Sequence, residues 1–111
     1  MSAFAEVIEK SIEQLSGIGV GVDEALLTAV AKGLGPSIYN QDSSLVAASD
    51  PEELARVKAN FLMGKLGLED GPELDAAIAE TMASMKGINR KLRVVVYYLL
   101  VKKFGKEAIY A

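Results

Sequence analysis

An unbroken run of eight apolar residues, Val94–Val101, constrains the fold of this chain more than any other feature. Its valines and tyrosines have strong β propensity, and the periodicity of a continuous apolar run does not distinguish helix from strand. The run has no convincing partner strand, because Gly17–Val22 is too rich in glycine. It also lies in a stretch of about sixteen apolar and basic residues, a length that favours a helix. We therefore predict a helix from about Asn89 to Phe104, covered on most sides by the rest of the protein.

Four further segments are predicted to be helices, because their apolar residues recur at intervals of three and four. Each begins at a capping residue or a proline and ends at a glycine, as helices commonly do. Residues 36–49 carry turn formers and few apolar anchors, so we expect an irregular segment with at most a short helical turn at 45–48. The four segments run from Ser2 to Gly17, from Asp23 to Gly35, from Asp50 to Gly67 and from Pro72 to Gly87.

The third of these helices has the clearest start signal in the sequence. Asp50 is the expected N-cap residue, and Pro51 follows at the first helical position. Glu53 stands three residues after Asp50, which is the spacing of a capping box. The sequence therefore predicts that Glu53 turns back toward the backbone N–H of the cap.

These segments predict an all-α fold, a compact bundle of about five helices around a central apolar C-terminal helix. With 111 residues, we expect a single helical domain over residues 1–111. Half of the residues are hydrophobic, although there are only three phenylalanines and no tryptophan. Such an aliphatic surplus is accommodated by a deeply buried element or by a self-association surface. We expect an interaction or structural protein that forms a homo-oligomer and binds a protein partner not specified by the sequence.

The charges are divided unevenly along the chain. Residues 1–85 hold five Lys or Arg and fourteen Asp or Glu, whereas residues 86–111 hold seven Lys or Arg and one acid. On a helix, Lys91, Lys102 and Lys106 would share one face, and Arg90 and Arg93 another. The three lysines are the candidate site of an alternative function, the binding of an anion or nucleic acid. Because the whole chain has a net charge of −3, nucleic acid is not the expected partner.

The absence of cysteine and histidine restricts the chemistry of this chain. It excludes disulfides, thiol chemistry and cysteine-based zinc sites, and it removes the commonest general base. We interpret the acids near residues 50 and 70 as helix caps rather than metal ligands. We expect no metal, no cofactor and no catalytic residues, and an enzyme that uses carboxylates or Tyr39 is the least favoured of three functions, after the interaction protein and the anion binder.

Two loops are candidate binding sites. Gly17, Gly19 and Gly21 precede a helix, but their spacing is not that of a dinucleotide-binding loop and no strand comes before them, so an interhelical loop is favoured. Tyr39 and Asn40 lie in the least regular segment, where turn chemistry explains them as well as binding does. The N-terminus lacks the features of a signal peptide and the apolar run is too short to cross a bilayer, so we expect a bacterial cytoplasmic protein without membrane contact.

Four segments together carry a resemblance to a known family: Lys32–Asn40, Val46–Leu54, Asn60–Leu62 and Tyr97–Leu100. They resemble a family of small bacterial proteins of about this length, which is classed only as a domain of unknown function. The likeness extends over nearly the whole chain. It implies a compact helical protein, and it brings no activity, cofactor or catalytic residue.

Overall fold

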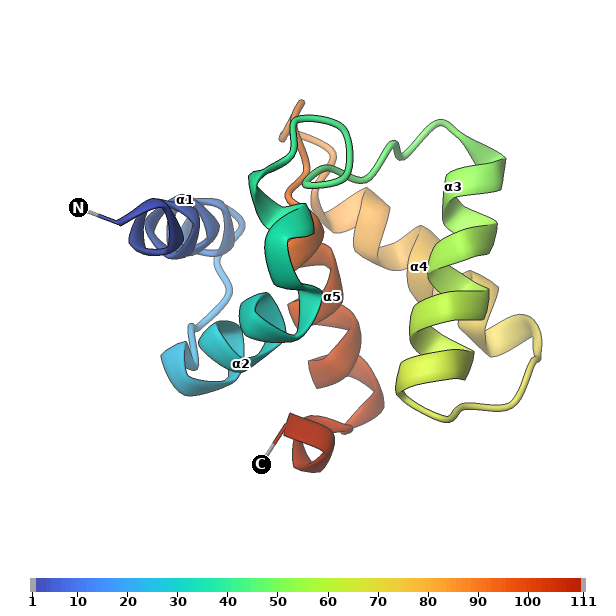
Figure 1. The fold of residues 1–111 in the computed structure, drawn as a ribbon. Coiled ribbons are helices and arrows are strands. Elements are labelled where there is room, and N and C mark those ends of the chain that lie inside the picture. Colours follow the sequence, from blue (N-terminus) through green and yellow to red (C-terminus); the bar gives the residue numbers. More distant parts are fainter. Residues whose placement is uncertain (1, 111) are drawn as a thin grey trace.

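The apolar run forms a helix at the centre of the molecule. The computed structural model describes residues 2–110, and in it α5 (Arg93–Phe104) packs against α1 (Ala3–Gly17), α2 (Glu24–Leu34) and α4 (Pro72–Ser84) (Figure 1). Seven of the twelve residues of α5 are buried. The aliphatic surplus is therefore used to surround α5. The predicted all-α fold with a central C-terminal helix is confirmed.

The remaining elements connect and cover this arrangement. A 3₁₀ turn (Gly35–Tyr39) follows α2, and a second one (Glu107–Tyr110) follows α5. Helix α3 (Pro51–Arg56) continues into a π-helix, η2 (Val57–Lys65). Residues 2–110 contain no helix that is long and apolar enough to cross a membrane.

The start of the last helix differs from the prediction. Helix α5 begins at Arg93 rather than near Asn89, because the backbone just before it is paired elsewhere. Leu92 forms an isolated antiparallel bridge with Leu45. In this bridge the Val46 N–H donates to Lys91 O (2.9 Å) and the Arg93 N–H donates to Ser44 O (2.8 Å). Residues 45–48 are irregular, as expected, and do not form the short helical turn that the sequence allowed, since extended backbone is needed for this pairing.

The start of α3 is partly as predicted. The Asp50 side chain accepts from the Glu52 N–H at 3.0 Å, and Pro51 is the first helical residue. Glu53 does not complete the predicted capping box, because its carboxylate is ion-paired with Arg56 and Arg93. Attraction to two guanidinium groups holds this side chain away from the cap. The helix then widens, and its end at Gly67 has the expected left-handed backbone (φ 70°).

The glycine-rich segment between α1 and α2 is an interhelical loop fastened to α5. Tyr98 is completely buried, and its hydroxyl donates to Gly21 O (3.1 Å) and accepts from the Asp23 N–H (2.9 Å). The Asp23 side chain in turn caps α2 through the Leu26 N–H (3.2 Å). One hydroxyl from the central helix thus fixes the path of the chain into α2.

Candidate functional site

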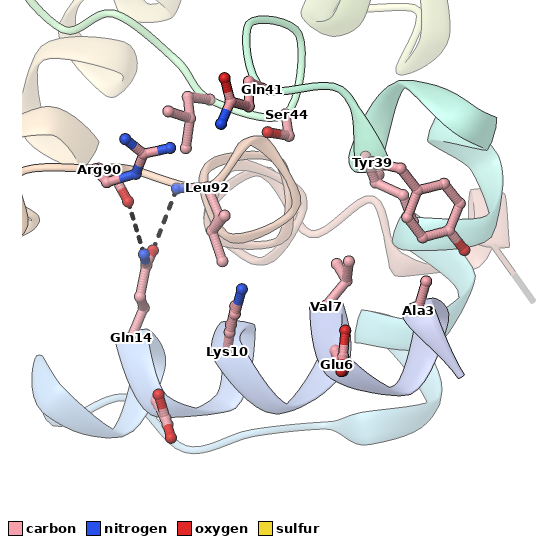
Figure 2. Close-up of a pocket in the computed structure, with 13 residues that line it drawn as sticks. Ala3, Glu6, Val7, Lys10, Gln14, Tyr39, Gln41, Ser44, Arg90 and Leu92 are labelled. Atoms are coloured by element: carbon pink, nitrogen blue, oxygen red, sulfur yellow. Dashed lines mark hydrogen bonds between the residues drawn. The ribbon is translucent and has the colours of Figure 1, made fainter. Parts of the chain in front are cut away.

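The structure has a groove of about 680 Å³ beside α1 (Figure 2). It lies between α1 on one side and the segment 38–45 on the other, with Arg90 and Leu92 between them. We call it the α1 groove. Its lining from α1 is Ala3, Glu6, Val7, Lys10, Glu13 and Gln14, and its lining from the opposite wall is Ile38, Tyr39, Gln41, Ser44 and Leu45.

The residues of α1 that line the groove all lie on one side of this helix. The lining residues of α1 recur at intervals of three and four, so they form one side of the helix. Ser11 and Leu15, on another side, are completely buried in the core. The predicted cap is confirmed, because the Ser2 side chain accepts from the Ala5 N–H at 3.1 Å. Core packing and capping together fix which side of α1 lines the groove.

Arg93 holds the opposite wall in place. Its Nε donates to Ser43 O (2.7 Å) and its Nη2 to Leu45 O (3.0 Å), while Nη2 also pairs with the Glu53 carboxylate. Its Nη1 donates to the Tyr97 hydroxyl at 3.1 Å. The planar guanidinium group therefore connects the irregular segment to both α3 and α5, which a lysine could not do with a single ammonium group.

The Arg93–Glu53 ion pair stays charged because its hydrogen bonds outweigh its burial. Burial lowers the pKa of Arg93, but the hydrogen bonds with Glu53 and Tyr97 raise it above its ordinary value. Burial likewise raises the pKa of Glu53, and the hydrogen bonds from Arg56 and Arg93 bring it below its ordinary value. The wall of the groove thus rests on a mostly buried charge pair, with side-chain exposures of 15% and 11%.

Gln14 closes one end of the groove. Its Nε2 donates to Arg90 O (2.7 Å) and its Oε1 accepts from the Leu92 N–H (3.2 Å), as the dashed lines in Figure 2 mark. This side chain ties α1 to the segment that precedes α5. Because the nitrogen and the oxygen of its side-chain amide are both hydrogen-bonded, Gln14 has a structural role.

Tyr39 forms the other end of the α1 groove, near Ala3 (Figure 2). Half of its surface is exposed, which is unusual here for so large an apolar side chain. Asn40, which follows it, performs the turn chemistry expected from the sequence, because its Oδ1 accepts from the Asp42 N–H (2.8 Å) and the Ser43 N–H (3.3 Å). Among the large apolar side chains of residues 36–49, Tyr39 is therefore the most open to contact.

The charged side chains of the groove form no ion pairs within the described part of the chain. Glu6, Lys10 and Glu13 lie one turn apart on α1, and neither they nor Arg90 belong to any of the ion pairs of residues 2–110. In Figure 2 the Lys10 ammonium group extends from α1 into the groove. These groups are therefore available to a binding partner. Sequence reasoning missed them because charges on an amphipathic helix are usually a solvated face.

The three lysines of the alternative hypothesis do not share a helical face. Lys91 lies before α5, and its Nζ donates to Ile88 O at 2.6 Å. Lys102 is in the last turn of α5 and faces Glu107 at 3.7 Å, while Lys106 follows the end of the helix. The expectation that one continuous helix aligns them is wrong, because that helix starts at Arg93 and stops at Phe104.

The acidic residues near position 70 form ion pairs with a lysine of the same chain. Lys58 Nζ contacts Asp70 at 2.7 Å and Asp75 at 3.0 Å, and this ammonium group holds the pKa of Asp70 below its ordinary value. Hydrogen bonds to the same two acids raise the pKa of Lys58. Within residues 2–110, no group of three or more potential ligands from His, Cys, Asp and Glu is placed to hold a metal ion.

The comparison with protein families confirms the resemblance read from the sequence. The model of a family described as "Protein of unknown function (DUF2853)" matches residues 8–108. A comparison with curated proteins gives no match. The matched region contains all five α-helices apart from residues 3–7 of α1, and it contains most of the residues that line the groove. The chain belongs to the DUF2853 family, whose function is unknown.

Proposed function

We propose that this protein is an interaction protein of the bacterial cytoplasm, and that it forms a homodimer through the α1 groove. The observation that carries the proposal is an open groove of about 680 Å³ with the half-exposed Tyr39 at its end. Tyrosine and arginine are enriched in protein interfaces, where they account for much of the binding energy. Tyr39 and Arg90 give the groove this composition.

The charges on α1 favour a second copy of this chain as the partner. In a twofold dimer, every contact between a residue of one copy and a residue of the other occurs twice. If two α1 helices lie antiparallel about an axis near residue 8, Lys10 of each copy meets Glu6 of the other. Both side chains are exposed and unpaired among the described ion pairs. The surface is thus complementary to itself.

The proposed dimer is weak. Only Tyr39 and Ile109 are large exposed hydrophobic side chains in the part of the chain described, so no extensive apolar surface is left to bury. The aliphatic surplus that suggested self-association is instead located around α5. An interface of this kind resembles the smaller, more polar interfaces of transient complexes rather than those of obligate dimers.

Sedimentation equilibrium over a range of protein concentrations tests the proposal. Wild type should show a reversible monomer–dimer equilibrium. Tyr39→Ala removes the exposed ring and should weaken the dimer about tenfold or more, as truncation of an interface hot spot does. Lys32→Glu is the matched control, because Lys32 is exposed on α2 and does not line the groove. A wild type that remains monomeric at every concentration contradicts the proposal.

The alternative is binding of an anion or nucleic acid by Lys91, Lys102 and Lys106. It retains the support of the basic C-terminal segment, but the contacts of Lys91 and Lys102 within the chain make it the weaker proposal. A filter-binding titration of wild type against the triple-alanine variant distinguishes the two. Tight, salt-dependent binding that is lost in the variant would favour the alternative.

A further inference from the structure

A second, smaller cavity lies between the end of α2, the π-helix η2 and the C-terminal turn. Its volume is about 180 Å³. It lies on a different set of residues from the α1 groove and plays no part in the proposed dimer. Its lining residues are Gly33, Leu34, Asn60, Phe61, Lys65, Tyr97 and Tyr110.

The π-helix creates one wall of this cavity. In an α-helix, successive residues are about 100° apart, so Asn60 and Lys65 would point about 140° away from each other. The wider turn of a π-helix, seen here in the bond from the Leu66 N–H to Phe61 O (2.9 Å), brings residues four and five apart to the same side. Asn60, Phe61 and Lys65 consequently line the same cavity. Short π-helical segments occur frequently at functional sites.

Aromatic rings form the apolar part of the cavity. Phe61 and Tyr97 are stacked, with centroids 3.8 Å apart and planes inclined by 17°. Tyr110 lies beside Gly33, where an added Cβ atom would make an ordinary van der Waals contact with its Cε1 at 3.5 Å. A larger side chain at position 33 would therefore occupy the space beside Tyr110. The absence of a side chain at Gly33 helps keep this space open.

A single cation stands at the cavity. Lys65 Nζ lies 5.3 Å from the centroid of the Tyr110 ring, and Lys65 takes part in none of the ion pairs found between residues 2 and 110. Asn60, an exposed amide on the same wall, can donate a hydrogen bond beside it. The polar groups thus favour an anionic oxygen, while the aromatic rings favour a flat apolar body.

We propose that this cavity binds a small aromatic carboxylate, with its ring against Phe61, Tyr97 and Tyr110 and its carboxylate toward Lys65 and Asn60. The size agrees with one ring, since a cavity of about 150 Å³ in another protein accommodates benzene. A combination of aromatic walls and a few convergent polar groups is typical of small-molecule sites. The charge of Lys65 selects an acid over a neutral or cationic ring.

Benzoate is the probe for this site, titrated into the full-length ¹⁵N-labelled protein and followed by NMR. The amides of Gly33, Lys65 and Tyr110 should shift in a saturable way, with the α1 groove unaffected. Lys65→Met keeps the apolar stem and removes the charge, so it should weaken binding about tenfold, the loss of one charge-assisted hydrogen bond. Lys86→Met is the matched control, because Lys86 is exposed and lines neither cavity.

Two further probes separate the features of the ligand. Benzylamine, which carries the opposite charge, should not bind, and cyclohexanecarboxylate, which lacks the flat ring, should bind more weakly than benzoate. Gly33→Leu fills the cavity and should abolish the shifts of Lys65. The proposal is overturned if benzoate causes no saturable shift at these residues, if Lys65→Met binds as wild type does, or if benzylamine or cyclohexanecarboxylate binds equally well. The benzoate titration does not depend on the proposed dimer, so its result stands even if wild type is monomeric in sedimentation equilibrium.

Discussion

Replacement of Arg93 by methionine should destabilise the protein more than any other change of a charged residue described above. The guanidinium group bonds to two backbone carbonyls, the Tyr97 hydroxyl and the Glu53 carboxylate. Breaking a buried ion pair typically costs about 3–5 kcal/mol. Glu53 keeps Arg56 as a partner at 2.8 Å, so it is not left unpaired, and we expect a loss of about 3 kcal/mol, the lower end of that range.

Urea unfolding followed by far-UV circular dichroism measures this loss. Methionine keeps an apolar stem beside the Tyr97 ring, which lies 5.6 Å from the guanidinium carbon, so the comparison isolates the polar contacts. Arg90→Met is the control, because Arg90 is exposed and should change the unfolding free energy by less than about 0.5 kcal/mol. Faster hydrogen exchange at the Val46 amide, which bonds across to Lys91, should accompany the loss. If Arg93→Met lowers the unfolding free energy by less than about 1 kcal/mol, the assigned role of Arg93 is refuted.

Three other perturbations have expected outcomes. Leu100→Ala should cost about 2–5 kcal/mol in a urea melt because Leu100 is completely buried, whereas Lys103→Ala should cost less than about 0.5 kcal/mol. Tyr98→Phe leaves two backbone groups without their partner and should cost about 1–2 kcal/mol in the same melt, and a neutral result would exclude the hydroxyl as an anchor. The depressed pKa of Glu53 contributes stability above its ordinary value of 4.5, which is lost as the pH falls through the folded-state value. In Glu53→Gln the unfolding free energy should therefore fall less than in wild type as the pH is lowered below about 5. Urea melts at several pH values measure this, and the same pH profile in both proteins would contradict it.

Local signals predicted the helices well, because they depend on residues close in sequence. Ser2, Asp23 and Asp50 cap the helices that they were expected to cap. Of the glycines predicted to end helices, Gly67 has left-handed backbone, and Gly105 has the same conformation at the end of α5. In each case the backbone geometry is determined within one turn of the residue, so the sequence pattern is sufficient.

Contacts between distant segments account for what the sequence did not reveal. Glu53 has the spacing of a capping box, but Arg93, forty residues later, provides a stronger partner. Asn89 begins no helix, because residues 44–46 and Gln14 bond to the backbone there. The candidate site depends on the same contacts, since Arg93 holds one wall of the groove and Gln14 closes one end. Only Tyr39 was singled out in advance, as a residue of an irregular segment.

A charge-swap experiment tests the proposed dimer most directly. Lys10→Glu alone places like charges opposite Glu6 twice in the twofold dimer, and Glu6→Lys alone places like charges opposite Lys10 twice. Each change should weaken self-association by about 2 kcal/mol, roughly thirtyfold, if each surface pair is worth about 0.5 kcal/mol and becomes equally repulsive. In an equimolar mixture of the two variants, both opposite-charge contacts are restored. Sedimentation should show heterodimers of near wild-type affinity in the mixture and monomers in each variant alone, whereas a mixture that stays monomeric, or single variants that dimerise like wild type, would contradict association through the α1 groove.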